Sequence, residues 1–116
     1  MTSAPLTNPA VPASIIYVTC GSREEATKIA RTVVEERLAA CANILGAIRS
    51  VYWWQGSVSE DDEVALILKT TVDKVAKVSE RVKELHSYEL PCVVEIQLGG
   101  GNAAYFDWIT AETTNV

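Results

Sequence analysis

The sequence predicts an α+β fold of the ferredoxin-like split βαβ type, with the element order β-α-β-β-α-β and a short C-terminal helix. Three observations support this prediction. Two stretches of helical periodicity alternate with apolar, β-branched runs. A Gln-Gly turn joins two of those runs into a hairpin. The 116 residues, 48% hydrophobic and 22% charged, suit one soluble globular domain.

The first 13 residues differ in character from the rest of the chain. They contain Pro5, Pro9 and Pro12 but no lysine or arginine, and a secretory signal needs a positive start and an unbroken apolar core. We expect residues 1–13 to be a disordered tail that adds nothing to the fold. The single domain is expected to occupy residues 14–116.

The first strand and helix follow the tail directly. Residues 14–20 are β-branched and apolar, as expected of a buried strand, and Gly21 ends that run. Ser22 lies three residues before Glu25, the spacing of a capping box at a helix start. Apolar residues then recur at helical intervals, which predicts a helix over residues 23–39.

Two long strands are expected next, joined as a hairpin. The first ends at residues 51–54, the turn occupies residues 55–57, and the second strand culminates in residues 63–70. Side chains alternate between the two sides of a strand, so Trp53 and Trp54 should serve different surfaces. We expect one tryptophan in the core and the other at an interface or pocket.

The C-terminal third is expected to hold a helix, a strand and a short helix. Apolar residues at helical spacing predict a helix over residues 72–85, and Pro91 prevents its continuation. Residues 92–98 alternate as a strand does. After three glycines, Asn102 can cap a short final helix.

The predicted sheet has more apolar surface than two helices can cover. Apolar residues occupy consecutive positions in three strand segments, residues 15–18, 51–54 and 64–68. We therefore expect both faces of the sheet to be buried. Large apolar patches are rare on monomers, so we expect a second copy of the chain to cover the free face. The alternative is that the C-terminal helix and tail fold over it.

Charge and cysteine content restrict the partners and the compartment. The net charge of −5 and the pI near 4.8 disfavour nucleic acid and anionic membrane surfaces as partners. Cys20, Cys41 and Cys92 are odd in number and show no zinc-type spacing, so free thiols in a reducing cytoplasm are expected.

Few residues stand out as chemical groups. The acidic residues 60–63 lack the spacing of a calcium loop and are interpreted as a solvated strand end. His86, the only histidine, ends the second predicted helix and is either a capping residue or a metal ligand. Cys20 ends the first strand and is either a small core residue or a functional thiol. No nucleophile–base pair is recognisable, so we do not expect an enzyme.

Five segments together resemble the CutA divalent-cation tolerance family. They occur in the family's order and cover nearly everything after the tail: residues 36–44, 50–56, 63–70, 83–91 and 101–109. The resemblance implies a ferredoxin-like subunit in a tight homotrimer, an association with copper and other divalent cations, and a cytoplasmic location in bacteria. A role in metal tolerance follows as an expectation.

The resemblance also implies a metal site. Cys20 matches the family's proposed cysteine ligand, and His86 matches the second histidine of a His-His pair. Leu85 replaces the first histidine, Ser87 replaces the proline that follows, and Cys92 replaces a glutamate. The expected copper ligands are therefore Cys20 and His86, with further ligands from Cys92, the backbone, water or a neighbouring subunit.

The resembling segments further suggest a cleft between subunits. Trp53, Lys69 and Tyr88 combine polar tips with apolar bodies, and we expect them to line it. The alternative function is a trimeric signalling or scaffold module resembling PII proteins. Such a module would hold a small anion or a partner's segment in that cleft, with Lys69 as the charge contact.

Overall fold

The computed structural model describes residues 12–114, which form an α+β fold with a four-stranded antiparallel sheet and three α-helices. The expected element order is confirmed. In chain order the elements are β1 (Ala13–Cys20), α1 (Arg23–Glu35), β2 (Cys41–Trp54), β3 (Ser57–Thr71), the 3-10 turn η1 (Val72–Lys74), α2 (Val75–Leu85), β4 (Val93–Gln97) and α3 (Ala103–Glu112).

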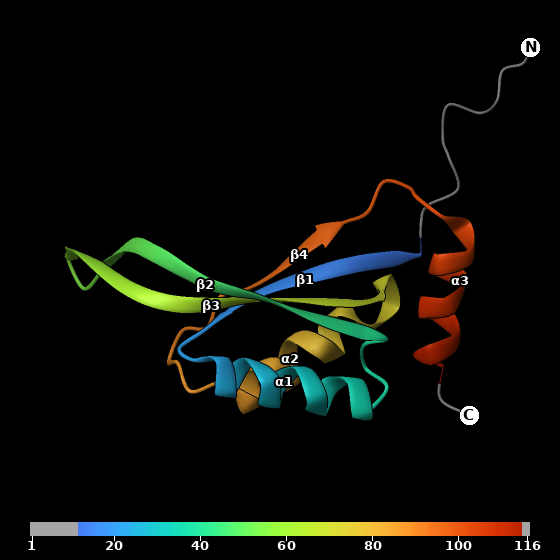
Figure 1. Ribbon diagram of the computed structural model, residues 1–116, viewed down its shortest axis with the longest axis horizontal. Helices are drawn as coiled ribbons and strands as arrows, with labels where there is room; N and C mark the ends of the chain where they lie inside the picture. The colour runs from blue at the N-terminus through green and yellow to red at the C-terminus, as the bar shows by residue number, and fades with distance from the viewer. Residues whose placement is uncertain (1–11, 115–116) are drawn as a thin grey trace, which may run out of the picture.

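The sheet has the strand order β2-β3-β1-β4, and α1 and α2 lie side by side against one of its faces (Figure 1). The core lies between these two layers. Ile16 and Val18 from β1 and Leu66 and Leu68 from β3 are fully buried there against the apolar stripes of both helices. No helix in residues 12–114 is long and apolar enough to span a membrane.

The expected boundary between tail and domain is wrong by two residues. Ala13 is the first residue of β1, pairs with Thr71 and is 1% exposed. The carbonyl of Pro12 accepts a hydrogen bond from the Val72 amide at 3.0 Å. Residues 12 and 13 therefore belong to the fold, whereas the rest of the predicted tail, residues 1–11, lies outside the described residues.

Helix α1 begins as predicted but ends four residues earlier. The Ser22 side chain accepts a hydrogen bond from the Glu25 amide at 3.1 Å, which confirms the cap. At the other end Arg37 adopts a φ of 62°, and the Leu38 amide donates to the carbonyl of Val33. This Schellman-type ending has arginine where glycine is usual, so the sequence lacked the ordinary stop signal.

The remaining boundaries differ from expectation only at the ends of elements. The second helix starts as the 3-10 turn η1 and continues as α2, and β4 is one residue shorter at each end than residues 92–98. The Asn102 side chain caps α3 as predicted, accepting a hydrogen bond from the Ala104 amide at 3.0 Å.

The β2–β3 hairpin is longer than the rest of the sheet. Pairing between β1 and β3 ends at Cys20 and Val64, so residues 48–63, here called the arm, extend beyond the helices (Figure 1). Gln55 and Gly56 both have positive φ, as a two-residue hairpin turn requires. Because no helix covers the arm, Trp53 and Trp54 are 74% and 38% exposed, and the expectation that one is core is wrong.

The sheet face turned away from α1 and α2 carries a continuous apolar surface. We call it the bare face; it consists of Ile15, Tyr17, Ile67, Val94 and Ile96. Ile15 pairs with Ile96, and Tyr17 lies between Val94 and Ile67 in the register. Val94 and Ile96 remain about half exposed, while α3 stands at the end of the sheet where β1 begins (Figure 1). The C-terminal helix therefore leaves these two side chains uncovered.

Candidate metal centre and adjoining groove

Three potential metal ligands meet where β1 and α2 end. Cys20 is the last residue of β1, Glu25 lies in the first turn of α1, and His86 is the C-cap of α2. One ligand atom from each lies within 4.8 Å of the others. The fold therefore brings the two predicted ligands together and adds Glu25, which sequence reasoning used only as a capping residue.

Glu25 joins the loop after β1 to the loop after α2. Its Oε1 accepts a hydrogen bond from the Gly21 amide at 3.1 Å, and its Oε2 accepts one from the Ser87 amide at 2.7 Å. Burial raises the pKa of Glu25, but the hydrogen bonds from Ser87 and Gly21 outweigh it. The pKa therefore lies below its ordinary value, and the carboxylate is ionised at neutral pH.

Both ring nitrogens of His86 already have hydrogen-bond partners. The Nδ1 atom accepts from the Tyr88 amide at 3.1 Å, so the network assigns the ring hydrogen to Nε2, which donates to the Thr19 carbonyl at 2.7 Å. The Glu25 carboxylate lies 3.8 Å from Nδ1, and the imidazole side chain is fully buried. A metal ion at His86 would have to replace one of these hydrogen bonds.

Cys20 is fully buried beside two carboxylates. Burial raises the pKa of its thiol to about 12, and the charges of Glu25 and Glu63 add to that increase. The thiol is therefore protonated at neutral pH in the absence of a cation. Because a metal binds the thiolate, occupation of this cluster would expel that proton.

The residues present fit a divalent transition metal. Thiolate, imidazole and carboxylate are all side-chain ligands found in zinc and copper sites. The carboxylates near Cys20 disfavour a bare thiolate, whereas a cation among them would reverse that effect. The donor set and its negative surroundings therefore favour a cation over an anion.

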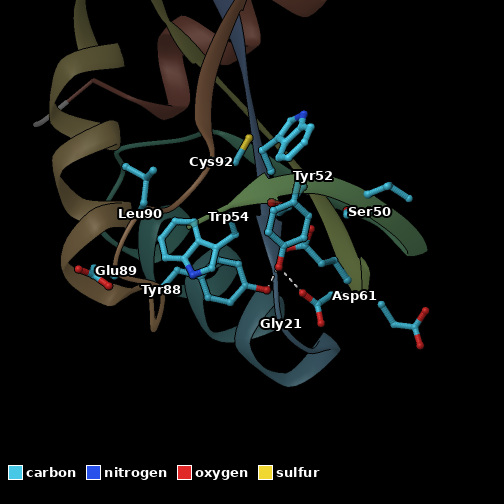
Figure 2. Close-up of a pocket in the computed structure, with 14 residues that line it drawn as sticks. Gly21, Ser50, Tyr52, Trp54, Asp61, Tyr88, Glu89, Leu90 and Cys92 are labelled. Atoms are coloured by element: carbon cyan, nitrogen blue, oxygen red, sulfur yellow. Dashed lines mark hydrogen bonds between the residues drawn. The ribbon is translucent and has the colours of Figure 1, made fainter. Parts of the chain in front are cut away.

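A groove of about 810 Å³ lies between the arm and the loops that follow β1 and α2. Figure 2 shows Tyr52 and Trp54 from the arm facing Tyr88 and Leu90 from the α2–β4 loop. The Tyr88 hydroxyl donates a hydrogen bond to Glu63 Oε2 at 2.8 Å. Burial, followed by this hydrogen bond and the nearby carboxylates, raises the pKa of Tyr88 well above its ordinary value.

Tyr88 connects the groove to the metal cluster. Its amide donates to His86, its ring lies 4.6 Å from the imidazole ring, centroid to centroid, and its hydroxyl contacts Glu63. Trp53 and Tyr88 both line this groove within one chain, and the expected cleft between subunits stays a prediction. Cys92 also lines the groove but is not part of the donor cluster.

Lys69 does not line this groove. It lies near the opposite end of β3, where its Nζ is 3.3 Å from the Tyr105 hydroxyl and 5.5 Å from the centre of that ring. A single chain therefore does not bring Lys69 to the groove that Trp53 and Tyr88 line, and a cleft shared by these residues between subunits stays a prediction.

Comparison with known proteins identifies the relatives of this chain. Residues 14–112 match the family model described as CutA1 divalent ion tolerance protein. The chain belongs to the CutA1 family. A Thermus thermophilus relative, the divalent-cation tolerance protein CutA, is 46% identical over 99 residues, which cover 85% of this chain and 96% of the relative. A rice relative, CutA 1, chloroplastic, is 39% identical, and the match covers 92% of this chain but 60% of the rice protein.

Solved structures of CutA1-family members share the fold. The periplasmic divalent cation tolerance protein CutA from Archaeoglobus fulgidus matches with a TM-score of 0.85 and 40% identity, covering 88% of this chain and 99% of that one. Rice CutA1 matches with a TM-score of 0.86 and 38% identity, covering 92% and 98%. The predicted family is therefore confirmed.

Proposed function

We propose that this CutA1-family protein binds divalent cations, chiefly copper, and contributes to metal tolerance. The observation that carries the proposal is the convergence of Cys20, Glu25 and His86 within 4.8 Å at the ends of three elements. The name of the Thermus thermophilus relative, divalent-cation tolerance protein, agrees with this role. The protein would act by binding, and no catalytic step is proposed.

The chemistry of the cluster favours copper among the divalent cations. Thiolate and imidazole are softer ligands than carboxylate, and copper binds most tightly among the first-row divalent ions at such sites. His86 would contribute a ring nitrogen released from one hydrogen bond, and Cys20 would contribute its deprotonated sulfur. Since that proton leaves on binding, copper affinity is expected to increase with pH.

We further propose a homotrimer that acts in the cytoplasm. The exposed bare face supports self-association, and the number three follows from the family resemblance. Free cysteines in the described chain suit a reducing compartment. The alternative, a PII-like module that holds a small anion or a partner's segment in a cleft between subunits, stays a prediction, because the carboxylate-lined groove described here belongs to one chain.

Copper titration tests the metal assignment most directly. We expect the wild type to bind one copper ion per chain with high affinity, measured by calorimetry at fixed pH. Cys20→Ser and His86→Ala should each weaken binding by at least about tenfold, since each removes a donor. Cys41→Ser is the matched control, because that thiol lies on β2 outside the cluster.

Cys20 and His86 are both buried, so their substitution could unfold the chain. Circular dichroism therefore checks that each variant is folded before its copper affinity is compared with that of the wild type. Cys92→Ser serves as a second control, since Cys92 lines the groove outside the three-residue cluster. The metal assignment is wrong if folded Cys20→Ser and His86→Ala both keep the full stoichiometry and affinity of the wild type.

A further inference from the structure

Glu63 is a nearly buried carboxylate without a cationic partner. Its residue is 9% exposed, and its one side-chain hydrogen bond among residues 12–114 comes from the Tyr88 hydroxyl. Within the same described range no ion pair includes Glu63. Removing a charged group from water is costly unless an opposite charge compensates it. A positive charge in the groove would therefore stabilise the Glu63 carboxylate.

The other charged groups of the groove increase that demand. Asp61, Asp62 and Glu89 line it together with Glu63, and no lysine or arginine is among its described lining residues. Asp62 alone of these four carboxylates is in an ion pair, with Arg49 at 3.0 Å. The groove is therefore negative: its described lining residues include four carboxylates and no basic side chain, and Arg49 neutralises only Asp62 among them.

Aromatic rings make up much of the rest of the groove. Trp53 of the arm lines the groove. Figure 2 shows Tyr52 and Trp54 from the arm and Tyr88 from the α2–β4 loop. The faces of such rings attract cations, and tryptophan does so most strongly. Aromatic walls combined with nearby carboxylates are the usual means of recognising alkylated ammonium groups.

The same carboxylates are poorly arranged for an inorganic ion. Hard divalent cations need several converging oxygen ligands. Among residues 12–114, Cys20, Glu25 and His86 form the only group of three converging donors. Asp61 accepts a hydrogen bond from Tyr52, Asp62 is paired with Arg49, and Glu63 accepts from Tyr88. An organic cation needs no coordination shell and fits the mixed lining better.

We propose that this groove binds a small organic cation with a quaternary or alkylated ammonium group. Glu63 supplies the counter-charge, and Trp53 and Trp54 of the arm supply aromatic rings. The volume of about 810 Å³ accommodates a ligand of this class. The site lies beside the buried donor cluster, to which Tyr88 joins it, but its lining includes none of Cys20, Glu25 and His86.

Choline chloride is the probe that tests this site on the full chain, with EDTA present to remove metal ions. We expect saturable changes in tryptophan fluorescence and a rise in the melting temperature, because the ligand binds the native state. Glu63→Gln should weaken choline binding by about tenfold or more, since it removes the counter-charge. Trp53→Leu should weaken it as well, and its 74% exposure makes misfolding of that variant a minor concern.

Two controls accompany these variants: one removes a carboxylate elsewhere in the protein, and the other is a ligand with the shape of choline but no charge. Glu80→Gln removes a carboxylate on α2 whose side chain is 73% exposed and should leave choline binding unchanged. The uncharged isostere 3,3-dimethylbutan-1-ol should bind far more weakly than choline. Circular dichroism checks that Glu63→Gln is folded like the wild type. If it is not, the choline affinity of Trp53→Leu provides the test of the site.

Three results would overturn the organic-cation site. If the neutral isostere bound as tightly as choline, the positive charge would not contribute to binding. If magnesium chloride gave the same saturable response as choline, the site would bind an inorganic ion. Absence of saturable choline binding, together with a changed solution mass of Glu63→Gln, would show that a second copy of the chain occupies the groove.

Discussion

The two faces of the sheet are built from the same kinds of residue but differ in burial. On the face under α1 and α2, Ile16 and Leu66 are completely buried. On the bare face, Val94 and Ile96 are 51% and 49% exposed, although they are equally apolar. Apolar sequence alone therefore does not distinguish a buried face from an exposed one. The number of helices available to cover the sheet makes that distinction.

This difference also separates two contributions to stability. The helix-covered face is buried when one chain folds, so its apolar area stabilises the monomer. The area of Val94, Ile96 and their neighbours is removed from water only if another molecule covers it. Substitutions on the two faces should therefore change different measurable quantities.

The largest effect on chain stability is expected at Leu66. Leu66→Ala leaves a cavity in the core under the helices and should lower the free energy of unfolding by about 3 kcal/mol. Urea unfolding followed by circular dichroism measures this loss. Leu90→Ala is the matched control, since Leu90 is 73% exposed and should change stability by less than about 0.5 kcal/mol. Equal losses at the two leucines would contradict the assignment of the core.

The second effect concerns assembly rather than folding. Val94→Asp places a charge on the bare face, which costs little in a monomer but must be desolvated in an interface. We expect the solution mass to decrease toward that of one chain while the circular dichroism spectrum stays native. If the mass were unchanged, the bare face would not be the contact surface.

The smallest effect is expected at the exposed end of the helix layer. Arg81 donates two hydrogen bonds to Glu36, at 2.9 and 2.8 Å, and they lower the pKa of Glu36 below its ordinary value of 4.5. A lowered folded-state pKa stabilises the fold above pH 4.5, and that contribution is lost as the pH decreases through the folded value. Glu36→Gln should therefore slightly reduce the loss of unfolding free energy as the pH decreases below 4.5, measured by urea titrations at each pH. A steeper pH dependence in the variant would contradict this sign.

Local signals in the sequence predicted most of the fold. The caps at Ser22 and Asn102 are encoded by a few neighbouring residues, so they could be predicted from the sequence alone. The end of α1 could not, because Arg37 adopts the left-handed conformation that glycine usually marks. The exposure of both Trp53 and Trp54 depends on how far the arm extends beyond the helices, which no local pattern records.

The candidate site divides in the same way. Cys20 and His86 could be proposed from the family resemblance, but Glu25 reaches them only because the fold brings the start of α1 beside the end of α2. Lys69 lies away from the groove, near the opposite end of β3, and that position depends on the register of the whole sheet. Long-range register and loop packing therefore limited the prediction of the site.

The solution mass of the unmodified protein tests the contrast between the two faces most directly. Light scattering at micromolar concentration should give three times the 12.6 kDa mass of one chain. A stable, well-behaved species of 12.6 kDa would contradict the account, because Val94 and Ile96 would then remain in water with no partner to cover them.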